Sequence, residues 1–195
     1  MKESRKPIRS AADGQIAFGK YAVVKTIESG SMAELHKARD REKGRIVLLR
    51  VLARSASENP EIRKLFADLH AERSRLFFED AYVLKVLELG RCQGRFYLAF
   101  EYLEGVSLVD FLKKERPGIE DALSIVRQAA EGLRAFHQRR LVHGDVKPAN
   151  IIVGRDSANR VRVKLAPMDI ATAASDSMVS IYGELMGTPK YLSPE

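Results

Sequence analysis

Alternating apolar and polar positions near the start of the chain predict a pair of antiparallel strands. Residues 21–29 (YAVVKTIES) and 33–40 (AELHKARD) alternate in this way, and residues 30–32 join them in a short connection. Residues 45–52 (RIVLLRVL) are instead apolar at almost every position. Such a run predicts a third strand that is buried on both faces of its sheet.

One helix and two further strands complete the pattern of the first half of the chain. Pro60 precedes a stretch of helical character at 61–78, and proline favours the first turn of a helix. Residues 81–91 and 95–103 have the character of strands, with a turn at 92–94 between them. This half therefore predicts about five strands and one helix.

Gly105 interrupts the strand pattern, and a short helix is predicted after it. That helix covers residues 107–115 and ends before the pair 117–118, which is Pro-Gly. Further along, residues 150–153 and 160–165 predict two short strands that are joined by a polar turn.

Residues 121–140 predict the longest helix of the chain. Their apolar side chains recur every three or four positions, which predicts one buried face. The predicted face consists of Leu123, Val126, Ala130, Leu133 and Phe136.

Composition and charge exclude several classes of protein. Hydrophobic residues make up 45% and charged residues 30% of the 195 positions, as in a globular protein. No apolar run reaches the length of about 18 residues that a membrane helix needs, so we expect no membrane segment within this chain. The net charge is +7, but the basic residues are scattered, so nucleic acid is not an expected partner. The single cysteine, Cys92, cannot form an internal disulfide, which agrees with a reducing, cytoplasmic location.

The most informative motif is LVHGDVKPANIIV at 141–153. It carries Asp145, then Lys147 two positions later and Asn150 five positions later, on a loop between the long helix and a strand. The motif resembles the catalytic loop of protein kinases, in particular the bacterial-type (Hanks-type) serine/threonine kinases. By this resemblance Asp145 accepts the proton of a substrate hydroxyl, Lys147 steadies the transferred phosphoryl group, and Asn150 binds magnesium.

Two other segments resemble kinase motifs in the expected order. Residues 98–108 (LAFEYLEGVSL) resemble the hinge, where Glu101 and Leu103 would offer backbone groups to the adenine of ATP. Residues 187–195 (GTPKYLSPE) resemble the end of an activation segment. The resemblance covers residues 21–195, nearly the whole chain.

The resemblance implies an α+β fold with two lobes. We expect a basic flexible tail at 1–20, a β-rich N-lobe with one helix at 21–104, and an incomplete, mainly helical C-lobe at 105–195. The kinase fold normally continues with further helices, so we expect the apolar face of the long helix to lack part of its cover. The resemblance also implies ATP as the nucleotide and a protein as substrate or partner.

Two departures from the kinase pattern affect the residues that contact the ATP phosphates. Gly30 remains from the glycine-rich loop, but Glu28 and Ala33 stand where the other two glycines are expected. Arg50 replaces the lysine of the third strand, and a planar guanidinium does not reproduce a compact ammonium group. Glu72 is the candidate helix partner of Arg50.

A third departure lies in the stretch VKLAPMDIA at 163–171. Aligned without a gap, Pro167 takes the place of the aspartate of the kinase Asp-Phe-Gly motif, so the carboxylate that holds magnesium is missing there. Asp169 is the candidate substitute, together with Asn150, because residues two positions apart lie on the same side of an extended chain. These substitutions put magnesium binding in doubt.

We therefore interpret the chain as a degenerate serine/threonine kinase domain, or pseudokinase, that serves as a nucleotide-binding or regulatory protein-interaction module. One alternative is an active atypical kinase, with Asp145 as the base and Asn150 and Asp169 as metal ligands. Another is a small-molecule phosphotransferase, because His-Gly-Asp also resembles the aminoglycoside and choline phosphotransferases. A gene fragment without a stable fold is the third.

Overall fold

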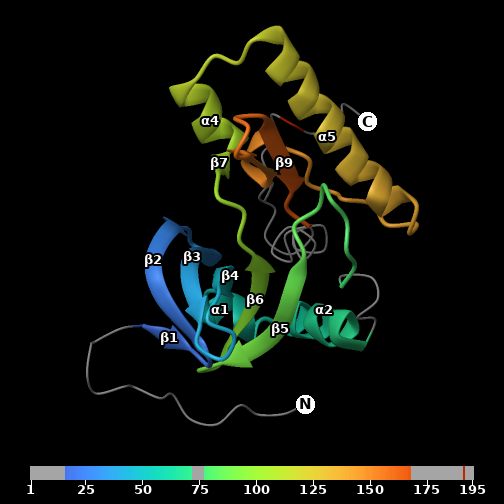
Figure 1. The fold of residues 1–195 in the computed structure, drawn as a ribbon. Helices are drawn as coiled ribbons and strands as arrows, with labels where there is room; N and C mark the ends of the chain where they lie inside the picture. Colours follow the sequence, from blue (N-terminus) through green and yellow to red (C-terminus); the bar gives the residue numbers. More distant parts are fainter. Residues whose placement is uncertain (1–15, 72–76, 168–190, 192–195) are drawn as a thin grey trace. The chain divides into compact units, whose positions relative to one another are not determined.

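The computed structural model describes residues 16–71, 77–167 and 191. The chain divides into two compact units, each built from two separate stretches (Figure 1). The first unit combines residues 1–73 with 86–102, and the second combines 74–85 with 103–195. Among the described residues, no helix is both long and apolar enough to cross a bilayer.

A single antiparallel sheet forms most of the first unit (Figure 1). Its strand order is β1-β2-β3-β4-β6-β5. The strands are β1 (Ala17–Phe18), β2 (Tyr21–Ser29), β3 (Ala33–Asp40), β4 (Ile46–Leu52), β5 (Val86–Cys92) and β6 (Arg95–Glu101). Two helices follow β4, namely α1 (Arg54–Glu58) and α2 (Pro60–Ala71).

The strands of the first unit agree with the sequence pattern at β2, β3 and β4, whereas the strand predicted over 81–91 is wrong over residues 81–85, because β5 begins at Val86. β2 and β3 have the predicted bounds, and the Gly30 N–H closes their connection by donating to the Ala33 carbonyl at 2.9 Å. β4 is buried on both faces as predicted, because Leu48 is buried on one face and Leu49 on the other. The two short elements β1 and α1 were not predicted. They hold too few residues to show a period.

Helix α2 begins at the predicted proline but is shorter than expected. The side-chain oxygen of Asn59 accepts the backbone N–H groups of Glu61 and Ile62 at 2.8 and 3.3 Å, which satisfies two otherwise unpaired donors. Residues 77 and 78 were predicted to be helical and are not, and 72–76 lie outside the described residues.

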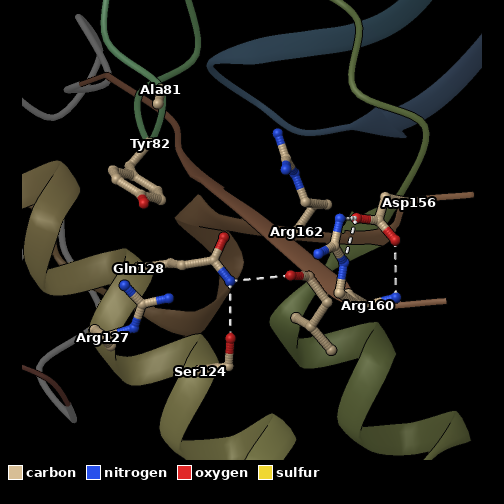
Figure 2. Close-up of a pocket in the computed structure, with 9 residues that line it drawn as sticks. Ala81, Tyr82, Ser124, Arg127, Gln128, Asp156, Arg160 and Arg162 are labelled. Atoms are coloured by element: carbon tan, nitrogen blue, oxygen red, sulfur yellow. Dashed lines mark hydrogen bonds and ion pairs between the residues drawn. The ribbon is translucent and has the colours of Figure 1, made fainter. Parts of the chain in front are cut away.

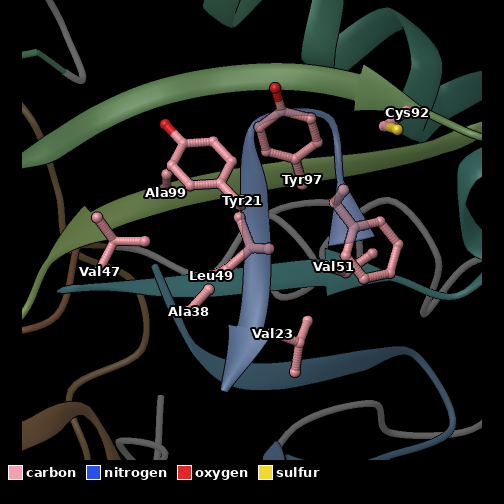
Figure 3. Packing of buried hydrophobic residues seen from close by; sticks show 10 residues of the cluster. Tyr21, Val23, Ala38, Val47, Leu49, Val51, Cys92, Tyr97 and Ala99 are labelled. Carbon is pink, nitrogen blue, oxygen red and sulfur yellow. The ribbon is translucent and has the colours of Figure 1, made fainter. Parts of the chain in front are cut away.

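A hydrophobic core of the first unit lies on one face of the sheet, where side chains of all six strands meet (Figure 3). One polar group is built into its edge. Glu88 accepts hydrogen bonds from the hydroxyls of Tyr21 and Tyr97 at 2.9 and 2.7 Å, and forms an ion pair with Lys20 at 2.6 Å. The two tyrosine rings meet edge to face at 5.8 Å. Burial, together with the neighbouring carboxylate, raises the pKa of both tyrosines far above the ordinary value.

The second unit packs helices against a small three-stranded sheet of order β7-β8-β9 (Figure 1). Its elements are β7 (Val106–Ser107), α4 (Leu108–Lys114), α5 (Ile119–His137), the 3-10 turn η1 (Pro148–Asn150), β8 (Ile151–Arg155) and β9 (Val161–Leu165). Ser107 caps α4 by accepting the Asp110 N–H at 3.2 Å. A Cβ on Gly105 would lie 2.4 Å from the Val153 carbonyl oxygen, so a glycine is needed where the chain enters β7.

The predicted buried face of α5 is wrong over its first half. Leu123 and Val126 are 63% and 68% exposed, and Ala130 is exposed as well. Leu133 and Phe136 do pack into the core of this unit.

Two residues that no apolar pattern selects explain how α5 is oriented. Gln128 is 6% exposed because its side chain bonds the backbone of β9, donating to the Val161 carbonyl and accepting the Val163 N–H, both at 3.0 Å. Gly132 is buried, and a Cβ there would lie only 2.9 Å from the Tyr82 carbonyl oxygen. Only a glycine therefore allows the two backbones to come this close. The hydrogen bonds of Gln128 to β9 and the close approach of Gly132 to Tyr82 therefore decide which face of α5 is buried.

Candidate functional site

The predicted catalytic-loop residues lie together in the second unit, between α5 and β8. The Lys147 ammonium lies 2.8 Å from Asp145 Oδ2, and the Asn150 amide nitrogen donates to the same oxygen at 2.7 Å. Asn150 also donates to the Asp145 backbone carbonyl at 2.8 Å. The Asp145 side chain is only 10% exposed and that of Lys147 is 20% exposed. The loop thus holds one carboxylate between a cation and an amide.

His143 holds this loop in place through hydrogen bonds to Asp145 and Ala166, a role that the sequence did not predict. Its ring is 1% exposed and meets Phe136 edge to face at 5.2 Å. Nδ1 accepts the Asp145 N–H at 3.3 Å, so Nε2 carries the proton and donates to the Ala166 carbonyl at 2.7 Å. Burial lowers the pKa of His143, which keeps the ring neutral. The spacing of the motif carries no signal of this contact.

Backbone bonds and one glycine fix the remaining shape of the loop. The Asn150 N–H donates to the Lys147 carbonyl at 2.9 Å and closes the turn η1. Gly144 has φ of +73°, a conformation that strains residues with a Cβ. The backbone conformation itself therefore favours the glycine of this chain.

The end of β9 lies beside the catalytic-loop residues. The Ala166 N–H donates to the Asn150 carbonyl at 2.8 Å, which brings the end of β9 to the catalytic loop. Pro167 follows directly and is buried. It offers no carboxylate beside Asn150.

The carboxylates needed for magnesium are incomplete in the described part of the chain. Asn150 supplies an amide oxygen and Asp145 a carboxylate, and residues 16–71 with 77–167 contain no cluster of three or more His, Cys, Asp or Glu side chains suited to a metal. Asp169, the predicted second ligand, lies outside the described residues. The described donors alone therefore do not fit the usual magnesium site of a kinase.

The predicted phosphate-contacting residues of the first unit lie on adjacent strands of its sheet. Glu28 is opposite Leu35, and Leu35 is opposite Arg50 in the registers of β2, β3 and β4. Directly opposed residues share a face, so Glu28 and Arg50 flank Leu35 on one side of the sheet. Gly30 is exposed at the β2–β3 connection.

The other predicted residues are distributed between the units. Glu101 ends β6 in the first unit, whereas Leu103 belongs to the second. Glu72, the candidate partner of Arg50, lies outside the described residues. The structure thus brings together Asp145, Lys147 and Asn150, while the remaining assignments stay predictions.

Comparison with protein families and relatives identifies the fold. The protein kinase domain model matches residues 21–195. The chain is 29% identical over 183 residues to a probable serine/threonine-protein kinase, pknA2, of Bifidobacterium longum, covering 93% of this chain and 24% of that protein. It is 31% identical over 179 residues to the serine/threonine-protein kinase PknD of Mycobacterium tuberculosis, covering 91% and 26%. The chain therefore spans about a quarter of the length of these relatives.

Solved structures agree on the fold alone, since their identities are low. The kinase domain of PknI from Mycobacterium tuberculosis aligns with a TM-score of 0.66 and 24% identity, over 80% of this chain and 62% of that one. A structure of Rad53 in complex with AMP-PNP aligns with a TM-score of 0.68 and 17% identity, over 90% and 42%. The predicted α+β, kinase-like fold with an incomplete C-lobe is confirmed. The chain belongs to the protein kinase family and is a domain of the serine/threonine protein kinase type.

Proposed function

We propose that this domain is impaired in phosphotransfer and acts as a nucleotide-binding or regulatory protein-interaction module. The observation that carries the proposal is the place of Pro167. The Ala166 backbone is tied to Asn150 on one side and to His143 on the other, so residue 167 is the position next to the catalytic loop. A proline there cannot supply the carboxylate through which magnesium neutralises the charge of the transferred phosphoryl group.

The sheet of the first unit supports the same proposal. Glu28 lies on the face that also carries Arg50, with Leu35 between them. A carboxylate in the phosphate-binding loop repels a triphosphate, at a cost of about 1 kcal/mol when the two are close and partly screened. Arg50 keeps the positive charge of the usual lysine but not its shape.

Nucleotide binding without magnesium remains part of the proposal. Glu101 and Leu103 would offer backbone groups to an adenine, and these contacts need no metal. The similar fold of Rad53 was solved with AMP-PNP, a nucleotide analogue. ATP is therefore the proposed ligand and a protein the proposed partner, as is usual in this family.

An active atypical kinase is the second candidate, and the preserved catalytic loop favours it. Asp145 would act as the base, Lys147 would contact the phosphate, and Asn150 with Asp169 would hold the metal. The ion pair of 2.8 Å between Lys147 and Asp145 is compatible with these roles. The match to the protein kinase family favours a protein hydroxyl over a small-molecule acceptor.

Calorimetric titration with ATP, with and without magnesium, tests the proposal on the natural full-length protein. We expect binding that is independent of magnesium, and the same affinity in Asp145→Asn. The Asp169→Ala variant reports whether that carboxylate replaces the missing one.

Tight binding that requires magnesium and is lost in Asp169→Ala would contradict the proposal and support the active kinase. In that case Asp145→Asn should also abolish phosphotransfer to a protein substrate. Binding that ignores magnesium, or no binding of ATP at all, would leave the domain as a binding module.

A further inference from the structure

A cavity lies in the second unit, and none of its lining residues belongs to the catalytic loop. The cavity has a volume of about 350 Å³, a size within the range of small-ligand pockets. Figure 2 shows it between α5, the end of β8, β9 and the segment that carries Tyr82. The lining residues are Ala81, Tyr82, Ser124, Arg127, Gln128, Asp156, Arg160, Val161 and Arg162.

The base of this cavity is held rigidly. The Gln128 amide nitrogen donates to Ser124 Oγ and to the Val161 carbonyl, both at 3.0 Å (Figure 2). Its oxygen accepts the Val163 N–H at 3.0 Å. Gln128 is buried, and its bonds to Val161 and Val163 join α5 to β9, so these two walls of the cavity are fixed to each other.

The charge of the lining is unbalanced. Asp156 pairs with Arg160 at 2.9 Å and also accepts the N–H groups of its own turn, and these bonds lower the pKa of its carboxyl. Arg160 is thereby neutralised. Arg127 and Arg162 form no ion pair or hydrogen bond through their side chains with any residue that the structure describes. Among the residues that the structure describes, the lining therefore carries two guanidinium groups that no carboxylate pairs.

Two hydroxyls add neutral donors to these cations. The Tyr82 hydroxyl makes no hydrogen bond within the described residues, and the hydroxyl proton of Ser124 is left over because its oxygen only accepts from Gln128. Guanidinium groups and hydroxyls together suit an anion with several oxygens. A phosphate monoester carries about two negative charges and three terminal oxygens, which balances two arginines better than a single carboxylate does.

We infer that this cavity binds a phosphate monoester, presented either by a small molecule or by a phosphorylated serine side chain. Arg127 and Arg162 contact the phosphate oxygens, and Tyr82 and Ser124 donate hydrogen bonds to them. The site does not depend on the proposed loss of phosphotransfer, because none of its residues belongs to the catalytic loop.

Calorimetry with O-phosphoserine on the natural full-length protein tests the inference. We expect the Arg127→Gln/Arg162→Gln double variant to bind about tenfold or more weakly, since two charge-assisted contacts are removed. The matched control is Arg63→Gln/Arg116→Gln, which removes the same charge at two exposed arginines outside the cavity. Its affinity should stay within about twofold of the parent. Tyr82→Phe, which removes one hydroxyl, gives an independent and milder loss.

Absence of phosphoserine binding, or an equal loss in both double variants, would overturn the inference and leave only general attraction to a basic protein. A short peptide with one phosphoserine separates the two sources of phosphate. Binding of this peptide about tenfold tighter than the free amino acid would identify a phosphorylated protein segment as the ligand. Equal binding would identify a small phosphate ester, and unphosphorylated serine and peptide should not bind in either case.

Discussion

The catalytic loop and the phosphate-contacting residues of this domain differ in how much the fold depends on them. The loop is tied by partly buried hydrogen bonds from His143 to Ala166 and from Asn150 to Asp145. The β2–β3 connection around Gly30 is exposed, and Glu28 before it is exposed as well. Asp145 and Asn150, which keep the kinase pattern, thus have partners inside the fold, whereas Glu28, which departs from it, is exposed.

The difference between the loop and Glu28 shows that a motif can be preserved for the stability of the fold and not only for catalysis. Asp145 and Asn150 form hydrogen bonds with each other, so folding alone gives a reason to keep them. Glu28 has no such constraint at its exposed position. An intact catalytic loop is therefore weak evidence for activity, and four experiments sharpen the comparison.

The largest effect is expected from removing the anchor of the loop. His143→Ala deletes a buried ring and its bond to Ala166, and should lower the free energy of unfolding by about 2–3 kcal/mol. Thermal or urea unfolding measures the change. The control is Val142→Ala, since the neighbouring Val142 is 79% exposed. Equal stability of the two variants would show that the loop does not depend on His143.

The second largest effect is expected from placing a carboxylate at position 167, next to the preserved catalytic loop. Pro167→Asp places an acidic group beside Asn150, and should make ATP binding stronger by about tenfold when magnesium is present. Calorimetry with and without the metal measures the difference, and Pro167→Ala controls for loss of the proline. If both variants respond to magnesium equally, position 167 is not what limits the site.

A smaller gain is expected at the phosphate-binding loop. Glu28→Gly removes the repulsive carboxylate and should strengthen ATP binding by about fivefold, which corresponds to about 1 kcal/mol. Comparison with Glu28→Gln separates the charge from the added backbone freedom. An unchanged affinity in both variants would place Glu28 away from the nucleotide.

The smallest effect concerns pH. Burial lowers the pKa of His143 in the folded protein, so the unfolded chain binds a proton more readily. The stability that His143 contributes is therefore complete above its ordinary pKa of about 6.5 and is lost as the pH falls toward the folded value. Between about pH 7 and pH 6 the loss should stay under about 1 kcal/mol. Unfolding curves of the parent should fall more steeply with acid than those of His143→Gln, and parallel curves would contradict the assignment.

The sequence predicted the features that rest on local pattern. Strands β2 and β3 have the predicted bounds because alternation over eight or nine residues leaves one register to fit. The proximity of Asp145, Lys147 and Asn150 follows from their short spacing on one loop. The metal and nucleotide roles of the site residues remain predictions that only binding measurements test.

What the sequence missed depends on contacts between distant residues. The face of α5 is set by Gln128, whose partners Val161 and Val163 lie 33 and 35 positions away. His143 bonds Ala166, which is 23 positions away. The cavity proposed to bind phosphate brings together Arg127 of α5 and Arg162 of β9, which the sequence showed only as scattered basic residues. No period or motif encodes such pairs.

The buried cluster around Glu88 gives this domain a built-in optical probe. The chain contains six tyrosines and no tryptophan, so its near-ultraviolet absorbance comes mainly from tyrosine. Tyr21 and Tyr97 have strongly raised pKa values, so they should ionise last in an alkaline titration. Because both belong to the core of the first unit, the delayed part of the absorbance change should mark the moment at which that unit opens. Alkaline spectrophotometry can therefore follow the first unit without a label.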